Sequence, residues 1–211
     1  MNIETITRAI NKHALTVVGA LHPESDKTII LLGPNEPIFW GHFTNSKEYI
    51  DGRRDPLDRW SMRVIGDLAS EFSARAVFPF GGPPYHPFID WALRSNSVWQ
   101  SPVQLLVHHS SGLFVSFRGA LIFEESMELP AAKQSPCKTC AEKPCLSACP
   151  AAALTSDGYN VSKCHDFLDS SDGTDCLTNG CLVRRACPVG QNLRLQPQSA
   201  FHMRAFHKGN N

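Results

Sequence analysis

The stretch Ser135–Pro150, "SPCKTCAEKPCLSACP", holds four cysteines and ends in Cys-Pro. A second group of four cysteines follows and also ends in Cys-Pro, so all eight cysteines of the 211-residue chain lie between Cys137 and Cys187. The 136 residues that precede Cys137 contain none. Because thiolates are preferred ligands of soft transition-metal centres, this distribution indicates metal binding confined to one part of the chain.

The spacing of the two groups resembles that of bacterial ferredoxins with two iron–sulfur clusters, with longer gaps. In that pattern three thiolates of a group hold one cluster, and the fourth cysteine, which precedes a proline, reaches the other cluster. We therefore predict two [4Fe–4S] clusters, each with four cysteine ligands. The first set is Cys137, Cys140, Cys145 and Cys187, and the second is Cys149, Cys164, Cys176 and Cys181.

Other interpretations of the cysteines stay open at this point. Cys137 and Cys140 alone fit half of a zinc site, although zinc sites usually combine two such pairs. Disulfides would suit an exported chain, but the first residues lack a basic segment followed by an apolar one. The four residues between Cys140 and Cys145, where two are usual, leave room for a three-iron or labile first cluster. In every metal-bound case we expect residues 136–190 to fold around the metal.

Charge and hydropathy exclude several classes of partner. The chain has 20 basic and 20 acidic residues, so no net field attracts it to nucleic acid or to an anionic membrane. No apolar run approaches the roughly 20 residues of a membrane span. We expect a cytoplasmic protein that binds neither nucleic acid nor membrane.

The cysteine-free part predicts an α+β fold. Residues 3–13 have the apolar spacing of a helix, and residues 15–21 and 27–34 read as strands. Asp55 followed by Pro56 predicts the N-cap of a long helix, whose apolar positions continue to Phe72. A further helix is expected at about His86–Arg94.

Two apolar runs in "PVQLLVHHSSGLFVSFRGALIFEE", residues 102–125, predict a β-hairpin around a His-His-Ser-Ser-Gly turn. The polar connector "MELPAAKQSP", residues 127–136, then marks a domain boundary. We expect an α/β domain at 1–130, a ferredoxin-like domain at 131–200, and a flexible tail at 201–211.

A few residues outside the cysteines are candidate ligand contacts. Tyr85 and His86 are the polar tips of the loop "FPFGGPPYHPF", residues 78–88, which either lines a cofactor pocket or packs as a rigid proline loop. His108 at the expected hairpin turn is either a metal ligand or a solvated histidine. Arg184 and Arg185 lie close to Cys187 in sequence. They either raise the reduction potential of the adjacent cluster and attract an acidic redox partner, or they only stabilise the fold.

Two quoted stretches carry a resemblance to a known family. The stretches "CPAAALTSDGYNVSKCHDFL", residues 149–168, and "WQSPVQLLVHHSSGLFVSFRGALIFEESMELP", residues 99–130, are similar to the cluster region of the epoxyqueuosine reductases and the related reductive dehalogenases. The resemblance implies a shortened N-terminal α/β sandwich, related to nitroreductases and cobalamin-processing proteins, followed by two clusters that pass electrons to cobalt. Ser101, Pro102 and Val103 stand where those reductases have Gly-Lys-Asn.

These observations favour an iron–sulfur redox protein that transfers electrons at low potential between a reductase and an acceptor protein. The alternative is an oxidoreductase or cobalamin-handling protein in which the clusters reduce a corrinoid, a flavin or a small-molecule acceptor bound by the N-terminal domain. The complete ligand set supports the first. The resemblance, together with the 130 residues that a simple carrier does not need, supports the second.

Overall fold

The computed structural model describes residues 2–208, which form a mixed arrangement of helices and strands, as the expected α+β class requires. The chain divides into two units. The first unit takes residues up to 98 and residues 116–134, and the second takes residues 99–115 and those from 135 onward. The division differs from the boundary expected near residue 130, because residues 99–115 belong with the cysteines and not with the sheet.

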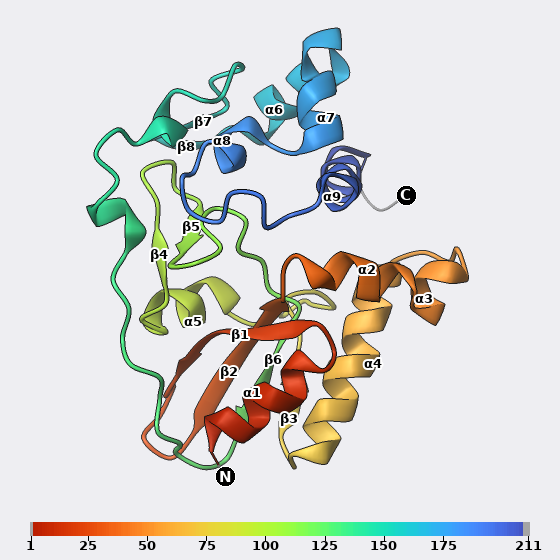
Figure 1. Ribbon diagram of the computed structural model, residues 1–211, viewed down its shortest axis with the longest axis vertical. Helices are drawn as coiled ribbons and strands as arrows, with labels where there is room; N and C mark the ends of the chain where they lie inside the picture. The colour runs from red at the N-terminus through yellow and green to blue at the C-terminus, as the bar shows by residue number, and fades with distance from the viewer. Residues whose placement is uncertain (1, 209–211) are drawn as a thin grey trace. The chain divides into compact units, whose positions relative to one another are not determined.

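A four-stranded antiparallel sheet forms the centre of the first unit (Figure 1). The two apolar runs near the N-terminus form adjacent strands, as predicted, and Leu31 at the middle of the second pairs with Gly19 and with Ala120. The strand order is β1-β2-β6-β3. The bounds are Leu15–Leu21 for β1, Thr28–Pro34 for β2, Arg75–Val77 for β3 and Gly119–Phe123 for β6.

Helices cover both faces of this sheet. A Cβ on Gly119 of β6 would meet Ile65 of helix α4 (Pro56–Glu71), while a Cβ on Gly19 of β1 would meet Ser95, directly after helix α5 (Phe88–Arg94). Gly19 lies level with Ala120, the neighbour of Gly119, and successive residues of a strand face opposite sides. Helices α4 and α5 therefore lie on opposite faces, and helix α1 (Ile3–Asn11) packs against β1.

Helix α4 begins at Pro56 with Asp55 at the N-cap position, as predicted, but Asp55 does not cap the helix through its side chain. Asp55 adopts the left-handed conformation, with φ of 51°, and its side chain makes no capping hydrogen bond. An N-cap residue normally has extended backbone, which lets its side chain reach the first free N–H groups. The buried face that holds the helix is Leu57, Trp60, Ser61, Val64, Ile65, Leu68 and Ala69.

Two short helices that the sequence did not predict precede α4, namely α2 (Ile38–Thr44) and α3 (Lys47–Ile50). Helix α2 is held by aromatic packing, because the Phe39 ring meets the Trp60 ring edge-on at 5.4 Å between centroids. Helix α3 is held by an ion pair in which Arg63 donates to both carboxylate oxygens of Glu48, at 2.6 and 2.9 Å. Tertiary contacts of this kind leave no periodic signal in a helix of one or two turns.

The hairpin predicted for residues 102–125 was wrong. Strand β5 (Leu106–His108) pairs with β4 (Val98–Gln100), whereas β6 pairs with β2 and β3 in the large sheet. The His-His-Ser-Ser-Gly turn is present, and an isolated antiparallel β-bridge between His108 and Gly112 closes it. The two apolar runs therefore belong to different sheets and do not pair with each other, although they are close in sequence.

The rest of the second unit consists of short elements. They are η1 (Pro136–Lys138), η2 (Pro144–Leu146), β7 (Leu154–Thr155), β8 (Gly158–Tyr159), α6 (Val161–Asp169), η3 (Ser171–Gly173), α7 (Thr174–Asn179), α8 (Leu182–Arg185) and α9 (Gln196–Lys208). A flexible tail was expected from residue 201, but residues 201–208 belong to α9, which packs against α7. Residues 209–211 of that expected tail lie outside the described residues.

Between residues 2 and 208, no helix has both the length and the apolar character that a membrane span needs.

Candidate metal centre

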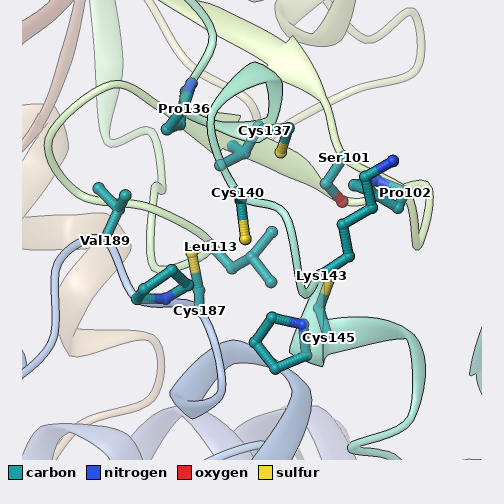
Figure 2. Close-up of a pocket in the computed structure, with 13 residues that line it drawn as sticks. Ser101, Pro102, Leu113, Pro136, Cys137, Cys140, Lys143, Cys145, Cys187 and Val189 are labelled. Atoms are coloured by element: carbon teal, nitrogen blue, oxygen red, sulfur yellow. The ribbon is translucent and has the colours of Figure 1, made fainter.

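Four cysteines line one cavity in the second unit (Figure 2). They are Cys137, Cys140, Cys145 and Cys187, the first predicted set. About 360 Å³ of space, part of it open solvent, lies in the cavity and its mouth. Its remaining wall is mostly apolar and is made by Ser101, Pro102, Val107, Leu113, Pro136, Lys143, Pro144, Pro188 and Val189.

Two proline-initiated 3₁₀ turns position two of these sulfurs. Cys137 lies in η1 and Cys145 in η2, each directly after a proline. Lys143, with φ of 43°, turns the chain in the left-handed conformation immediately before η2. The longer gap between Cys140 and Cys145 therefore forms a compact turn that returns Cys145 to the same cavity as Cys140.

The fourth sulfur of the set, on Cys187, is fixed by close backbone packing. A Cβ on Gly112, which has φ of +56°, would lie 2.1 Å from the Val189 carbonyl oxygen and 3.0 Å from Cys187 Sγ. A Cβ on Gly190, with φ of +75°, would lie 2.6 Å from the Ser111 carbonyl oxygen. These approaches require glycine, and they explain why residues 99–115 belong to the cysteine unit.

A second cavity, with about 340 Å³ of space that includes open solvent at its mouth, is lined by Cys149, Cys164, Cys176 and Cys181, the second predicted set. Cys164 lies in α6, Cys176 in α7, and Cys181 precedes α8. The backbone N–H of Ala153 donates to Cys149 Sγ at 3.2 Å. Other wall residues are Pro150, Ala151, Ala153, Leu154, Tyr159, Phe167, Leu168, Leu182, Val183 and Met203.

Electrostatics couples the sulfurs within each set. Burial, and then the neighbouring sulfurs of the first set, raise the pKa of Cys145 and of Cys137, while a hydrogen bond from Ser135 opposes the shift at Cys137. Burial also raises the pKa of Cys164, and a hydrogen bond from Tyr159 opposes it. Four thiolates crowded in a partly desolvated cavity disfavour one another, so a cationic metal group is the natural counter-charge.

The donor chemistry fits an iron–sulfur group. In the part of the chain that the structure describes, none of the eight cysteines forms a disulfide. Within residues 2–208, no three or more Cys, His, Asp or Glu side chains are grouped so that they could hold one metal ion. The four sulfurs of each set surround a cavity instead of meeting at a point, whereas a single zinc ion binds each sulfur at about 2.3 Å. Thiolates spread around a cavity suit a group of several irons.

The other predicted ligand contacts do not form one described site. Tyr85 and His86 belong to the first unit, where Tyr85 is largely exposed and the His86 ring stacks on Trp91 at 5.8 Å. His108 belongs to the second unit and is buried. Its Nδ1 accepts a hydrogen bond from the backbone N–H of Ser111 at 3.2 Å, which shapes the turn that ends at Gly112.

The two arginines near Cys187 make structural contacts. Arg184 donates from Nη1 to the Leu113 carbonyl oxygen. Arg185 forms an ion pair with Asp175 and donates to the Gly180 carbonyl oxygen at 3.0 Å. Both guanidinium groups therefore tie α8 to neighbouring segments.

Sequence reasoning missed three polar side chains of the cavities, namely Ser101, Ser135 and Tyr159. Ser101 lines the first cavity. Ser135 donates a hydrogen bond to Cys137, and Tyr159 donates one to Cys164. The departure from Gly-Lys-Asn at Ser101 was the one available signal. The positions of Ser135 and Tyr159 in the sequence do not indicate that they contact cysteines.

Comparison of the chain with protein families, with curated proteins and with solved structures found no match. The chemistry of the site is therefore inferred from its own residues, which place four cysteines in each of two cavities.

Proposed function

We propose that the chain is an iron–sulfur redox protein that holds two [4Fe–4S] clusters and transfers electrons at low potential. One observation carries this proposal. Cys187 closes the second cysteine group in sequence yet lines the first cavity, and Cys149 closes the first group yet lines the second. This exchange of the two Cys-Pro cysteines is the ligation expected of a two-cluster ferredoxin, and it has no role in two independent zinc sites.

The residues of the chain have separable tasks in such a protein. When bound, a [4Fe–4S] cluster supplies reversible one-electron chemistry. The cysteines hold it, while apolar walls such as Val107, Leu113 and Leu168 limit access of water. The Ala153 N–H on Cys149 and the Ser135 hydroxyl on Cys137 lower the negative charge felt at the sulfurs, which favours the reduced state.

The resemblance to the epoxyqueuosine reductases supports a finer fold assignment. The second unit is then ferredoxin-like, and the first is a shortened relative of the α/β sandwich of nitroreductases and cobalamin-processing proteins. Helices on both faces of the sheet are consistent with a sandwich. The redox partner in this assignment is another protein.

The test is anaerobic reconstitution followed by iron and sulfide analysis and electron paramagnetic resonance (EPR) of the dithionite-reduced protein. We expect two clusters per chain and signals of two reduced centres. Cys145→Ser and Cys176→Ser are matched variants, because each removes a ligand from one cavity and should abolish one signal only. Zinc in place of iron, with no reduced-cluster signal, would sink the proposal.

The same sample distinguishes a carrier from a corrinoid-dependent reductase. We expect the EPR spectrum of added cob(II)alamin to remain that of the free cofactor. A shift to the base-off form at stoichiometric protein would instead assign corrinoid binding to the chain and make corrinoid reduction its function.

A further inference from the structure

Ser101 is one of the residues that line the first cysteine cavity. Ser101 is 4% exposed and lines this cavity together with the four sulfurs (Figure 2). Its Oγ is buried, and among the described residues it has no hydrogen-bond partner. Buried hydroxyl groups are rarely left without a partner, because desolvation is then uncompensated.

The backbone around Ser101 keeps this hydroxyl in place. The Ser101 N–H donates to the Leu105 carbonyl oxygen at 2.8 Å, and the Gln104 N–H donates to the Ser101 carbonyl oxygen at 3.0 Å. Val103, at the centre of this turn, and Val107, shortly after it, are fully buried in the apolar cluster that includes Cys145 and Cys187. Rotation about χ1 is therefore the main freedom of the Ser101 hydroxyl.

The side chains of the cavity wall offer this hydroxyl one kind of acceptor, the cysteine sulfurs. The other polar wall residue is Lys143, which is a donor and cannot accept a hydrogen bond. The acceptors that the proposed function brings to this cavity are thiolate and sulfide sulfurs. In its described rotamer the Ser101 hydroxyl reaches no acceptor within residues 2–208, so a hydrogen bond to sulfur requires rotation about χ1 or the sulfides of a bound cluster.

We propose that Ser101 donates a hydrogen bond to a sulfur of the cluster held by Cys137, Cys140, Cys145 and Cys187, and thereby raises the reduction potential of that cluster alone. The inference rests on the proposed function and adds a tuning residue to it. A donor to sulfur stabilises the more negative, reduced form, so losing the donor makes reduction harder.

The test is a redox titration monitored by EPR on the reconstituted full chain. In Ser101→Ala we expect the equilibrium constant for reduction of one cluster to fall about tenfold. Its reduction potential then falls by about 59 mV for one electron. The other potential should not move, and it serves as an internal reference. Ser101→Thr retains the hydroxyl and should keep both potentials near those of the wild type.

A matched control removes a comparable serine elsewhere. Ser95 in the first unit is 6% exposed, but its hydroxyl already donates to the Ala92 carbonyl oxygen at 2.7 Å. Ser95→Ala should leave both potentials unchanged.

A second variant covers failure of Ser101→Ala to assemble. Ser101→Val has nearly the shape of Ser101→Thr but carries no donor, so it should lower the same potential. Assembly of two clusters in Ser101→Thr, with failure in both variants that lack the hydroxyl, would also support the donor role. Two clusters at wild-type potentials in either Ser101→Ala or Ser101→Val would overturn it. Absence of clusters from the wild-type protein would instead contradict the proposed function itself.

Discussion

At the scale of single residues, the first cavity depends on a glycine that carries no ligand. Gly112 brings the turn after β5 against Val189 and Cys187. Because its φ of +56° suits glycine and a Cβ would collide with backbone, no side-chain adjustment can relieve a substitution there.

Gly112→Ala should displace Cys187 and abolish the EPR signal of the first cluster while the second remains. Iron content after reconstitution should fall by about half, since one of two equal clusters would be lost. Gly52→Ala is the matched control, because Gly52 has φ of +66° but its Cβ would meet nothing within 4 Å. Equal iron loss in both variants would show that backbone strain, and not the clash with Cys187, is responsible.

A second prediction at this scale concerns the ion pair that holds α3 to α4. Glu48 has a side chain 7% exposed, and Arg63, at 37%, binds both of its oxygens. Glu48→Gln should lower the free energy of unfolding of the first unit by about 2 kcal/mol, less than for a fully buried pair because Arg63 reaches solvent. Tryptophan fluorescence during urea denaturation measures this difference.

The same pair sets a pH dependence. The hydrogen bond from Arg63 lowers the pKa of Glu48 below its ordinary value of 4.5. Its contribution to stability is therefore complete above that ordinary value and is lost as the pH falls through the lower, folded-state pKa. The stability difference between wild type and Glu48→Gln should shrink in acid, and a difference independent of pH would contradict this account.

At the scale of elements, helix α9 forms part of the wall of the second cavity. Met203 lines that cavity, and Phe206 stacks on Tyr159 at 6.1 Å between ring centroids. The Tyr159 hydroxyl in turn donates a hydrogen bond to Cys164. The helix thus contributes a cover for the second set of sulfurs.

Met203→Ala should expose the second cavity and speed the loss of its cluster to a chelator several-fold, because removal of a large side chain leaves a cavity open to water. The first cluster should be lost at the wild-type rate, as followed by EPR at successive times. Arg204→Ala, on the exposed side of the same helix, is the control and should change neither rate.

At the scale of the whole molecule, the two units differ in what holds them together. The first has a sheet with helices on both faces and fully buried side chains such as Trp60, Phe39 and Ile30. The core cluster of the second unit contains two of the proposed ligands, Cys145 and Cys187, beside Val103, Val107, Leu113, Leu154 and Val183. We therefore expect its stability to depend on the proposed clusters.

Removal of iron by a chelator should unfold the second unit and leave the first folded. Hydrogen exchange followed by mass spectrometry should show lost protection in residues 135–208 and in 99–115, with β1, β2 and β6 still protected. Loss of protection in the segment 99–115 tests its membership of the second unit directly. Retained protection throughout that unit would show that it folds without metal.

The sequence by itself determined the features that rest on local pattern. Strands β1 and β2 and helix α4 lie where apolar periodicity predicted them, and the two sets of cysteines line the two cavities that their spacing implied. The identity of the metal stays a prediction. Repeated apolar spacing and Cys-Pro closings are properties of short segments, so they can be read without knowing the fold.

Only the tertiary structure decided the features that depend on contacts distant in sequence. It separated β5 from β6 into different sheets, formed α2 and α3 through packing on Trp60 and pairing with Arg63, and ordered α9 against α7. It also placed Ser101 and Gly112 at the first cavity. A strand's partner and a glycine's neighbour are set by long-range packing, which leaves no periodic trace in the segment itself.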